Sequence, residues 1–298
     1  MGYTFIMKGL IVTNAFFLDE NLRWHINRFI DEFTKLGIKM QWQKNDQVLA
    51  YLNNTCVECG LEYDFVLYLD KDIHICRMLE NAGLRVFNSA SAIEVCDDKL
   101  KTHIALSNHN IKMPKTVSSP LNYAGADDGT FVKNVLKILN FPIIVKECFG
   151  SLGMQVYKAD NLKELNVIRK KLTHKPHLYQ EYIGQKPGQD VRIIVIDKKA
   201  VSCMKRISKN DFRSNAGDRS FEVFSPDIKF IETAQKASKI LNLDYCGVDI
   251  LFGKNDEPVL CEVNSNAFFY KTESVTKINI ARLYAEYILK QIKKAKTL

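Results

Sequence analysis

The chain has 298 residues, of which 46% are hydrophobic and 26% are charged. This balance is typical of a globular protein, and the length allows two or three compact units. No apolar run approaches the roughly 20 residues that cross a bilayer, so we expect no membrane association. The first residues lack a charged segment followed by a long apolar stretch, which favours a cytoplasmic location.

The net charge of +8 is unevenly distributed along the chain. Residues 1–96 carry 9 basic and 12 acidic side chains, whereas the remainder carries 33 basic and 22 acidic ones. The positive field of residues 97–298 attracts anions, from nucleotides to acidic peptides. Nucleic-acid binders carry basic clusters with interleaved aromatic residues along one face. The sequence has no such stripe, so we expect no nucleic-acid partner.

The eight cysteines do not indicate a disulfide framework, because they are scattered and several lie in apolar runs. Cys56 and Cys59 form a lone C-x-x-C. Without a second pair or a histidine at metal-ligand spacing, this pattern does not predict a zinc site. Cys148 lies near a glycine-containing turn, and we assign it no covalent role.

Strands and helices alternate over the first third of the chain. The predicted elements are a strand over 8–13, a helix over 19–36, a strand over 64–69, a short helix that ends at Gly83, and a strand at RVFN. This alternation is typical of a parallel sheet. We therefore predict an α/β unit over residues 1–96.

The pattern changes after residue 96. We expect a helix over 98–108, a polar loop over 118–130, a further helix, the strands PIIVKEC and MQVYKA, a basic helix over 161–173, and the strand HLYQEYI. The strands DVRIIVI and AVSCMKR, a polar loop over 207–226, a long helix that ends near Leu241, two strands and a C-terminal helix follow. This order favours an α+β fold of antiparallel hairpins, which we divide into residues 97–183 and 184–298.

The segment CGVDILFGKNDEPVLCEVNSN predicts a hairpin, because two apolar strands flank a cluster of turn residues. If the turn centres on Asn255 and Asp256, Asp249 lies opposite Glu262. Alternation then places Asn264 on the same face. The opposite face, which has a core pattern, would hold Val248, Ile250, Cys261 and Val263.

Opposed Cβ atoms on paired strands lie about 5 Å apart. Two carboxylates at this spacing repel each other and lose hydration energy on an otherwise apolar hairpin. A divalent cation would relieve this repulsion, and oxygen ligands suit Mg²⁺ or Mn²⁺. The alternative is an acidic pair that faces the solvent.

Two lysines are candidate phosphate ligands. Lys146 ends a strand just before a turn that contains Gly150 and Gly153, and such a hairpin can place N–H groups and an ammonium group over phosphates. Lys99, in CDDKLKTH, is the second candidate. The alternatives are glycines that only shape the turn and a lysine on a helix surface. Neither common phosphate-loop motif occurs in the chain.

Asp190 and Arg192 lie two residues apart and therefore on one side of a strand. Arg206 closes the next strand, and FRSN (212–215) follows. Arginines beside a metal would hold phosphate or carboxylate oxygens through paired hydrogen bonds. The alternative is a set of cross-strand surface ion pairs.

The order of these features (Asp-Lys, a lysine before a glycine turn, QEY, D-x-R, MKR, FRSN, GVD and EVNS) resembles the ATP-grasp superfamily. Within it, the sequence is most similar to the RimK-type branch of α-L-glutamate ligases. The resemblance runs from about Phe87 to Asn264. It implies an ATP-grasp fold with an N-terminal parallel α/β domain, a central domain with a mobile lid, and a C-terminal antiparallel-sheet domain.

The resemblance also implies a role for each motif. Phosphates would meet Lys99, Lys146 and the lid residues Gly150, Ser151 and Gly153. Adenine would lie beside Gln180, Glu181, Tyr182 and Ile183, and the ribose hydroxyls beside Asp190. Two Mg²⁺ or Mn²⁺ ions would be held by Asp249, Glu262 and Asn264. The transferring phosphoryl group would be surrounded by Arg192, Arg206, Arg213, Ser214 and Asn215.

The implied activity is an ATP- and magnesium-dependent ligation of a carboxylate to an amine through an acyl phosphate. A glutamate-like amino acid would be added to an acidic peptide, protein or small carboxylate. After EVNS the chain reads Asn266-Ala267-Phe268-Phe269-Tyr270 where the branch has Ser-Pro-Gly, so the incoming amino acid stays open. Two alternatives are a dipeptide ligase with an aromatic pocket formed by Phe268, Phe269 and Tyr270, and a non-catalytic nucleotide-binding regulator. A dimer or tetramer is expected by resemblance.

Overall fold

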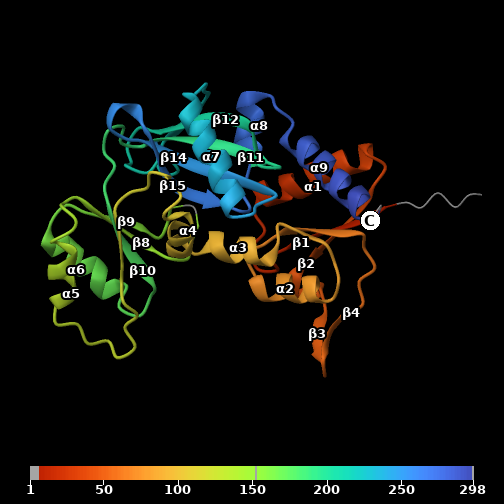
Figure 1. Cartoon of the computed structure of the whole chain (residues 1–298), viewed down its shortest axis with the longest axis horizontal. Coiled ribbons are helices and arrows are strands. Elements are labelled where there is room, and N and C mark those ends of the chain that lie inside the picture. Colours follow the sequence, from red (N-terminus) through yellow and green to blue (C-terminus); the bar gives the residue numbers. More distant parts are fainter. Residues whose placement is uncertain (1–6, 152, 297–298) are drawn as a thin grey trace, which may run out of the picture.

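The computed structural model describes residues 7–151 and 153–296. Its first sheet, of which Figure 1 labels β1 and β2, has the strand order β2-β1-β5-β6. The strands are β1 (Lys8–Thr13), β2 (Lys39–Lys44), β5 (Phe65–Leu69) and β6 (Val86–Phe87). All pairs are parallel, which confirms the predicted parallel sheet. Strand β2 was missed because its sequence, KMQWQK, is polar and lies at the sheet edge.

Consecutive residues of β1 and β5 are apolar and buried, so both faces of this sheet need to be covered. Helices cover each face. Ile11 and Leu67 face α1 (Glu20–Lys35) and α9 (Ile280–Lys296). The opposite face packs on α2 (Ile73–Asn81) and α3 (Ala90–Asp97). Helix α1 begins where the Asp19 carboxylate accepts a hydrogen bond from the backbone N–H of Leu22 at 2.8 Å.

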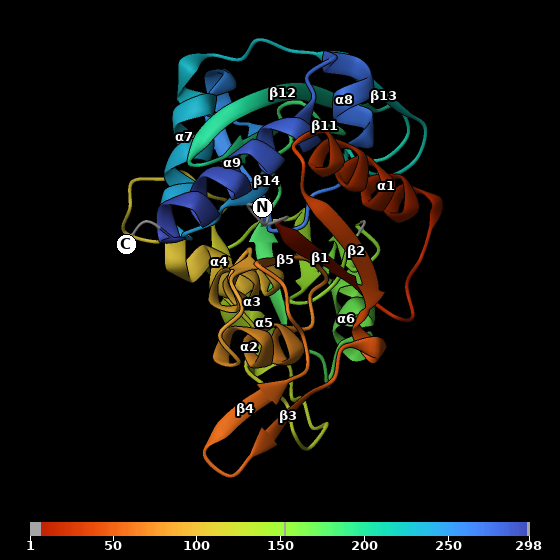
Figure 2. The ribbon, with the colours of Figure 1, turned by 90° about the vertical axis from the view of Figure 1, so that its right-hand side faces the viewer.

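A short hairpin projects from this part of the molecule (Figure 2). It consists of β3 (Ala50–Asn53) and β4 (Cys56–Cys59), and a 3₁₀ turn over Asn45–Gln47 precedes it. Cys56 and Cys59 are three residues apart on one strand, so their side chains point to opposite faces. The two thiols therefore do not face each other.

The second sheet is antiparallel, with the order β7-β10-β8-β9. Its strands are β7 (Thr116–Ser118), β8 (Ile143–Glu147), β9 (Val156–Ala159) and β10 (His177–Glu181). One face packs on α5 (Thr130–Val135) and α6 (Leu162–Lys171). Helix α4 (Lys99–Leu106) lies between this sheet and the third one (Figure 1).

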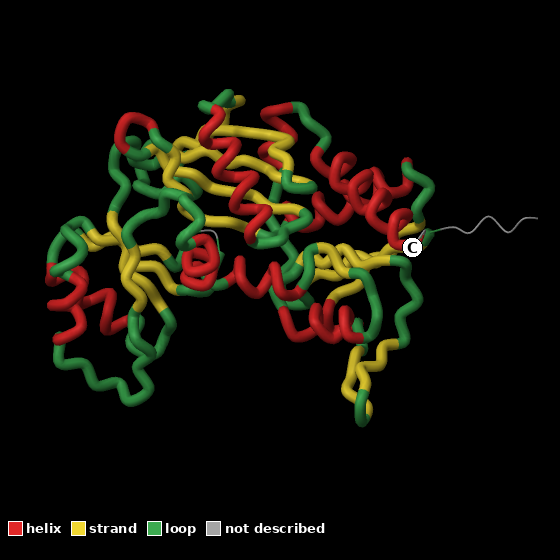
Figure 3. The backbone as a smooth tube through the Cα atoms, viewed as in Figure 1, coloured by secondary structure: helices red, strands yellow, loops and turns green. Residues whose placement is uncertain are grey.

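The third sheet, whose strands are drawn in yellow in the upper part of Figure 3, is also antiparallel, with the order β13-β12-β11-β14-β15. Its strands are β11 (Gln189–Ile196), β12 (Lys199–Ser208), β13 (Arg219–Val223), β14 (Tyr245–Phe252) and β15 (Pro258–Asn264). Helix α7 (Ile228–Ile240) covers one face, and a 3₁₀ turn over Lys254–Asp256 joins β14 to β15.

Two expectations for this part of the chain were wrong. Strand β13 lies within the predicted polar loop over 207–226, because pairing with β12 rather than an apolar pattern stabilises it. The single expected C-terminal helix is two helices, α8 (Tyr270–Thr276) and α9. Lys277, in the left-handed backbone region at φ 61°, ends α8.

The first and third sheets share one core. Its members include Phe65 of β5, Phe29 of α1, Ile194 of β11 and Tyr284 of α9. The three sheets fall within the three predicted sequence ranges, and the boundaries after residues 96 and 183 stay a prediction. Within the described ranges, no helix is long and apolar enough to cross a membrane.

Candidate active site

A cleft lies between the second and third sheets. Sixteen of the eighteen residues that the sequence singled out line it: Lys99, Lys146, Gly150, Ser151, Gly153, Gln180, Glu181, Tyr182, Ile183, Asp190, Arg206, Arg213, Ser214, Asn215, Asp249 and Glu262. Arg192 and Asn264 do not line it, although each lies within hydrogen-bonding distance of Asp249. Folding thus gathers residues from β8, β10, β11, β12, β14 and β15 around one space.

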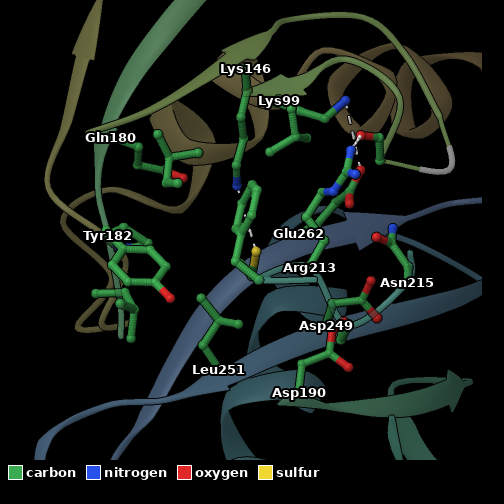
Figure 4. Close-up of a pocket in the computed structure, with 18 of the residues that line it drawn as sticks. Lys99, Lys146, Gln180, Tyr182, Asp190, Arg213, Asn215, Asp249, Leu251 and Glu262 are labelled. Atoms are coloured by element: carbon green, nitrogen blue, oxygen red, sulfur yellow. Dashed lines mark hydrogen bonds and ion pairs between the residues drawn. The ribbon is translucent and has the colours of Figure 1, made fainter. Parts of the chain in front are cut away.

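Two lysines reach into the cleft from the side of the second sheet (Figure 4). Lys99 Nζ donates to the backbone oxygen of Gly150 at 3.1 Å and lies 3.8 Å from Glu262 Oε1. Burial lowers the pKa of Lys99 from its ordinary value. Lys146 Nζ lies 3.6 Å from the Cys261 sulfur. Lys99 therefore forms a long ion pair with Glu262, whereas among the described residues Lys146 has no carboxylate in ion-pair distance, so its ammonium group is available to an anion.

The acidic hairpin forms with the predicted register. Asp249 of β14 pairs with Glu262 of β15, and Asn264 pairs with Gly247 two positions along. A bulge after Asp249 leaves Cys261 without a partner, because Ile250 pairs with Leu260. Cys261 therefore lines the cleft. Its predicted place on the core face was wrong, since strict alternation ends at a bulge.

Two arginines hold the carboxylates on the floor of the cleft. Arg192 donates to both oxygens of Asp249, each at 2.7 Å. Arg206 donates to both oxygens of Asp190 and lies 2.9 Å from Asp249 Oδ2. Although burial opposes ionisation of Asp249, the two guanidinium groups hold its pKa below the usual range. The two negative charges of Asp190 and Asp249 are thus balanced by the two positive charges of Arg206 and Arg192.

These residues offer a suitable donor set for magnesium. The two carboxylates face each other across β14 and β15, and Asn264 adds an amide oxygen. Among the described residues no group of three or more His, Cys, Asp and Glu side chains could hold a metal, because the third member here is an amide. Glu262 is the more accessible carboxylate, with 27% of its side chain exposed. A metal ion bound to Asp249 would have to share the oxygens of this carboxylate with Arg192 and Arg206.

The glycine turn between β8 and β9 lies against the 212–215 loop. Arg213 donates to the backbone oxygen of Gly153 at 2.6 Å, while Asp211 pairs with the same guanidinium. Gly153 has φ +72°, and a Cβ there would lie 2.7 Å from Asn215 Oδ1. Glycine is thus required both for the backbone conformation and for the close approach.

The other end of the cleft is more apolar. Figure 4 shows Gln180, Tyr182 and Leu251 there, away from Glu262, Arg213 and Asn215. Leu251 and Ile144 line this end, although the sequence analysis did not name them. Strand alternation could have predicted both, because Leu251 lies two positions from Asp249 and Ile144 two positions from Lys146 on the same strands.

Comparison with known proteins identifies the family of the chain that forms this cleft. A model of the RimK-like ATP-grasp domain matches residues 96–288. The chain belongs to the RimK-like ATP-grasp family. This confirms the resemblance drawn from the motifs, and it places the chain among ATP-grasp carboxylate–amine ligases.

Curated relatives of this RimK-like chain include proteins with and without an assigned activity. The MG012 homolog of Mycoplasma pneumoniae is 31% identical over 86% of this chain and 86% of that protein. Human N-acetylaspartylglutamate synthase A is 29% identical over 74% of this chain and 56% of that protein. The chain therefore matches little more than half of the length of the human ligase.

Solved structures agree with the ATP-grasp fold. The ATP-grasp ligase PsnB, solved with a minimal precursor, has a TM-score of 0.72 at 17% identity, over 96% of this chain and 99% of that one. D-alanine–D-alanine ligase from Bacillus anthracis, solved with ATP, has a TM-score of 0.72 at 16% identity, over 98% of this chain and 100% of that one. At these identities the likeness concerns the fold alone.

The loop where the chain departs from the RimK-type pattern forms only part of the aromatic pocket considered above, and that part lies outside the cleft. Phe269 is 1% exposed within the core shared by the first and third sheets. Phe268 and Phe269 line a small second cavity with His25, whereas Tyr270 does not line it. Tyr270 instead packs against Trp24. The loop contributes mainly to packing between the two sheets, which sequence spacing alone did not reveal.

Proposed function

We propose that this RimK-like chain joins a carboxylate to an amine in a reaction that consumes ATP. The observation that carries the proposal is the grouping of Lys99, Lys146 and Arg213 opposite Asp249 and Glu262 in one cleft. Cations and carboxylates placed around one space suit a triphosphate with bound magnesium. The apolar end of the cleft suits the base.

The chemistry follows from the weak reactivity of carboxylates. The substrate carboxylate attacks the γ-phosphorus of ATP, ADP leaves, and an acyl phosphate forms. The amine then attacks the acyl carbon, phosphate leaves, and an amide bond remains. Lys99 and Lys146 hold the phosphates, while Arg213, with Ser214 and Asn215, balances the charge on the transferring group.

Further roles follow from the floor of the cleft. Arg206 lines the cleft and would meet an acyl phosphate once its contact with Asp190 is shared. Arg192 does not line the cleft, so it would support the acyl phosphate by holding Asp249 in place. Asp190 would accept from the ribose hydroxyls, and Glu181, Tyr182 and Ile183 would border adenine. Two Mg²⁺ or Mn²⁺ ions held by Asp249, Glu262 and Asn264 would neutralise phosphate charge. The turn of Gly150, Ser151 and Gly153 would cover the phosphates and exclude water.

We further propose an acidic carboxylate acceptor and a glutamate-like amine. The net positive charge of residues 97–298 supports the acidic acceptor, and the human relative named as a synthase of N-acetylaspartylglutamate supports glutamate. An acidic peptide or protein tail is one such acceptor. A cytoplasmic location and a dimer or tetramer remain predictions.

Phosphate release from ATP with magnesium tests the proposal across a panel of amino acids, acidic peptides and small carboxylates. We expect release that requires both an amine and a carboxylate, with a product heavier by one residue in mass spectrometry. Glu262→Gln should lower the rate by about 100-fold, because one charged metal ligand is lost. Glu257→Gln is the matched control, since Glu257 pairs with Lys112 outside the cleft.

Three outcomes would contradict parts of the proposal. Unchanged release by Glu262→Gln would refute the metal site. Turnover with small amino acids and with no acidic acceptor would refute the acceptor class and favour a dipeptide ligase. Tight binding of magnesium–ATP without release for any pair would favour the regulator.

A further inference from the structure

Gln180 presents an unpartnered polar atom to the apolar end of the cleft. The residue lies on β10, lines the cleft and is only 2% exposed. Its carboxamide carries one acceptor and two donors, so the two ends of the group recognise opposite partners. The orientation of this amide can be worked out from the residues behind it, Thr116 and His103, neither of which lines the cleft.

Thr116 defines which end of the amide points away from the cleft. The Thr116 hydroxyl donates its single proton to the backbone oxygen of Pro114 at 2.8 Å. Toward Gln180, whose amide lies 2.9 Å away, the hydroxyl oxygen can therefore only accept. The atom beside Thr116 must be the amide nitrogen of Gln180.

His103 leads independently to the same orientation. Its Nε2 lies 3.4 Å from the Gln180 nitrogen, and its ring also makes a hydrogen bond to the backbone of Cys261. Burial lowers the pKa of His103 to about 4, so the imidazole is neutral at pH 7 and carries one proton. That proton serves the Cys261 carbonyl, which leaves an acceptor toward Gln180.

The amide oxygen of Gln180 is consequently directed to the cleft. Among the described residues, no donor lies within hydrogen-bonding distance of this oxygen. The fully enclosed polar atoms without a partner do not include it, so the oxygen is accessible from the cleft. It therefore opens onto the space that Ile144 and Leu251 also line. A single acceptor in an apolar surrounding favours a ligand that donates an N–H at that point.

We propose that His103 and Thr116 are positioning residues that fix the Gln180 carboxamide with its oxygen in the cleft, where it selects adenine over guanine. The proposal rests on the nucleotide site proposed above. The exocyclic 6-amino group of adenine donates to this oxygen. Guanine and hypoxanthine carry a carbonyl oxygen at the same position, which would face another acceptor. A site built for a donor rejects ligands that lack one.

Equilibrium binding to the full chain tests the selection. Isothermal titration would compare magnesium complexes of ATP, GTP and purine riboside triphosphate, which lacks the 6-amino group. We expect wild type to bind ATP roughly 10- to 100-fold more tightly than the other two, because an unmatched buried acceptor costs about that factor. Gln180→Met should bring all three affinities close together.

The positioning role makes a further prediction. Thr116→Val removes one of the two groups that orient the amide, so the ratio of ATP to GTP affinity should fall several-fold while GTP binding improves. Thr116→Ser keeps the hydroxyl and should restore the ratio. Thr233→Val, an equivalent change on the exposed face of α7, should leave it unchanged. A purely structural defect would weaken both nucleotides equally.

Each contrary outcome is distinct. Equal wild-type affinity for ATP and GTP would overturn the base selection and leave the nucleotide site intact. A constant ratio in Thr116→Val would overturn the positioning role. Failure of wild type to bind any of the three nucleotides would refute the nucleotide site, and with it the function proposed above.

Discussion

At the scale of single residues, the cleft floor is a buried network of two arginines and two carboxylates. Arg206 connects Asp190 to Asp249, and all three side chains are nearly inaccessible to water. Burial of ions costs several kcal/mol each unless partners satisfy them. Arg206 is thus the residue on which the two acids depend most, since Arg192 contacts Asp249 alone.

Arg206→Met should lower the free energy of unfolding by about 3–5 kcal/mol, because it leaves two buried carboxylates without a shared cation. Urea unfolding at pH 7 measures this change. Arg213→Met is the control: its pair with Asp211 is partly exposed, so a loss of about 1 kcal/mol or less is expected. Equal losses in the two variants would show that burial of the network is unimportant.

At the scale of elements, the turn between β8 and β9 combines backbone constraint with contact to the 212–215 loop. Gly153 adopts φ +72°, and its carbonyl accepts from Arg213. Gly129, before α5, adopts a similar φ of +78° but has open space around it. Substitutions at these two glycines can therefore be compared to distinguish the cost of backbone strain from the effect of a steric clash at the cleft.

Gly153→Ala and Gly129→Ala should each lower the free energy of unfolding by about 1 kcal/mol, because alanine disfavours positive φ. Only Gly153→Ala should also reduce phosphate release, by about 10-fold, since its Cβ would press on Asn215 and misplace the turn. Thermal unfolding and the release assay measure the two effects. Equal rates of phosphate release by both variants would refute a role of this turn in the reaction.

At the scale of the whole molecule, a polar and aromatic seam joins the first sheet to the third. The side chain of Asn88 donates to the backbone oxygens of Tyr245 and Ser265, each at 2.8 Å. His25 of α1 accepts from the backbone N–H of Phe269 at 2.7 Å. Arg28 of the same helix pairs with Glu273 of α8 at 2.9 Å. This seam fixes the first sheet and its helices against the third sheet.

His25 makes the seam sensitive to acid. Burial lowers its pKa to about 4, partly opposed by the Asn21 carbonyl and Asp19, whereas an unfolded histidine titrates near 6.5. Between these values the unfolded chain binds more protons, so stability falls as the pH drops from about 6.5 toward 4. The contribution of His25 between pH 7.5 and pH 5 is on the order of 2 kcal/mol.

Urea unfolding of His25→Gln at pH 7.5 and pH 5 tests this contribution. We expect the acid-induced loss of stability to be smaller than that of wild type by on the order of 2 kcal/mol. The exposed His109 provides the control, and His109→Gln should leave the acid-induced loss unchanged. An unaltered pH dependence in His25→Gln would mean that His25 binds a proton equally well in the folded and unfolded chain, which would refute its role in the acid sensitivity.

Local rules explain how far the sequence prediction reached. The register of Asp249 and Glu262 follows from one short turn and strand alternation, both local properties. The same rules failed at Cys261, where a bulge interrupts alternation, and at β13, whose polar residues depend on a partner strand. Phe269 gave no local sign that it belongs to a core shared with α1.

The sequence by itself determined the family, the parallel and antiparallel sheets and the set of charged residues that meet in the cleft, because these follow from motifs and from periodicity along the chain. Only the tertiary structure decided that two arginines engage Asp249, that His103 and Thr116 orient Gln180, and that the aromatic loop is core. Such contacts join residues more than 50 positions apart. Their partners depend on how the sheets pack, which periodicity within one element does not encode.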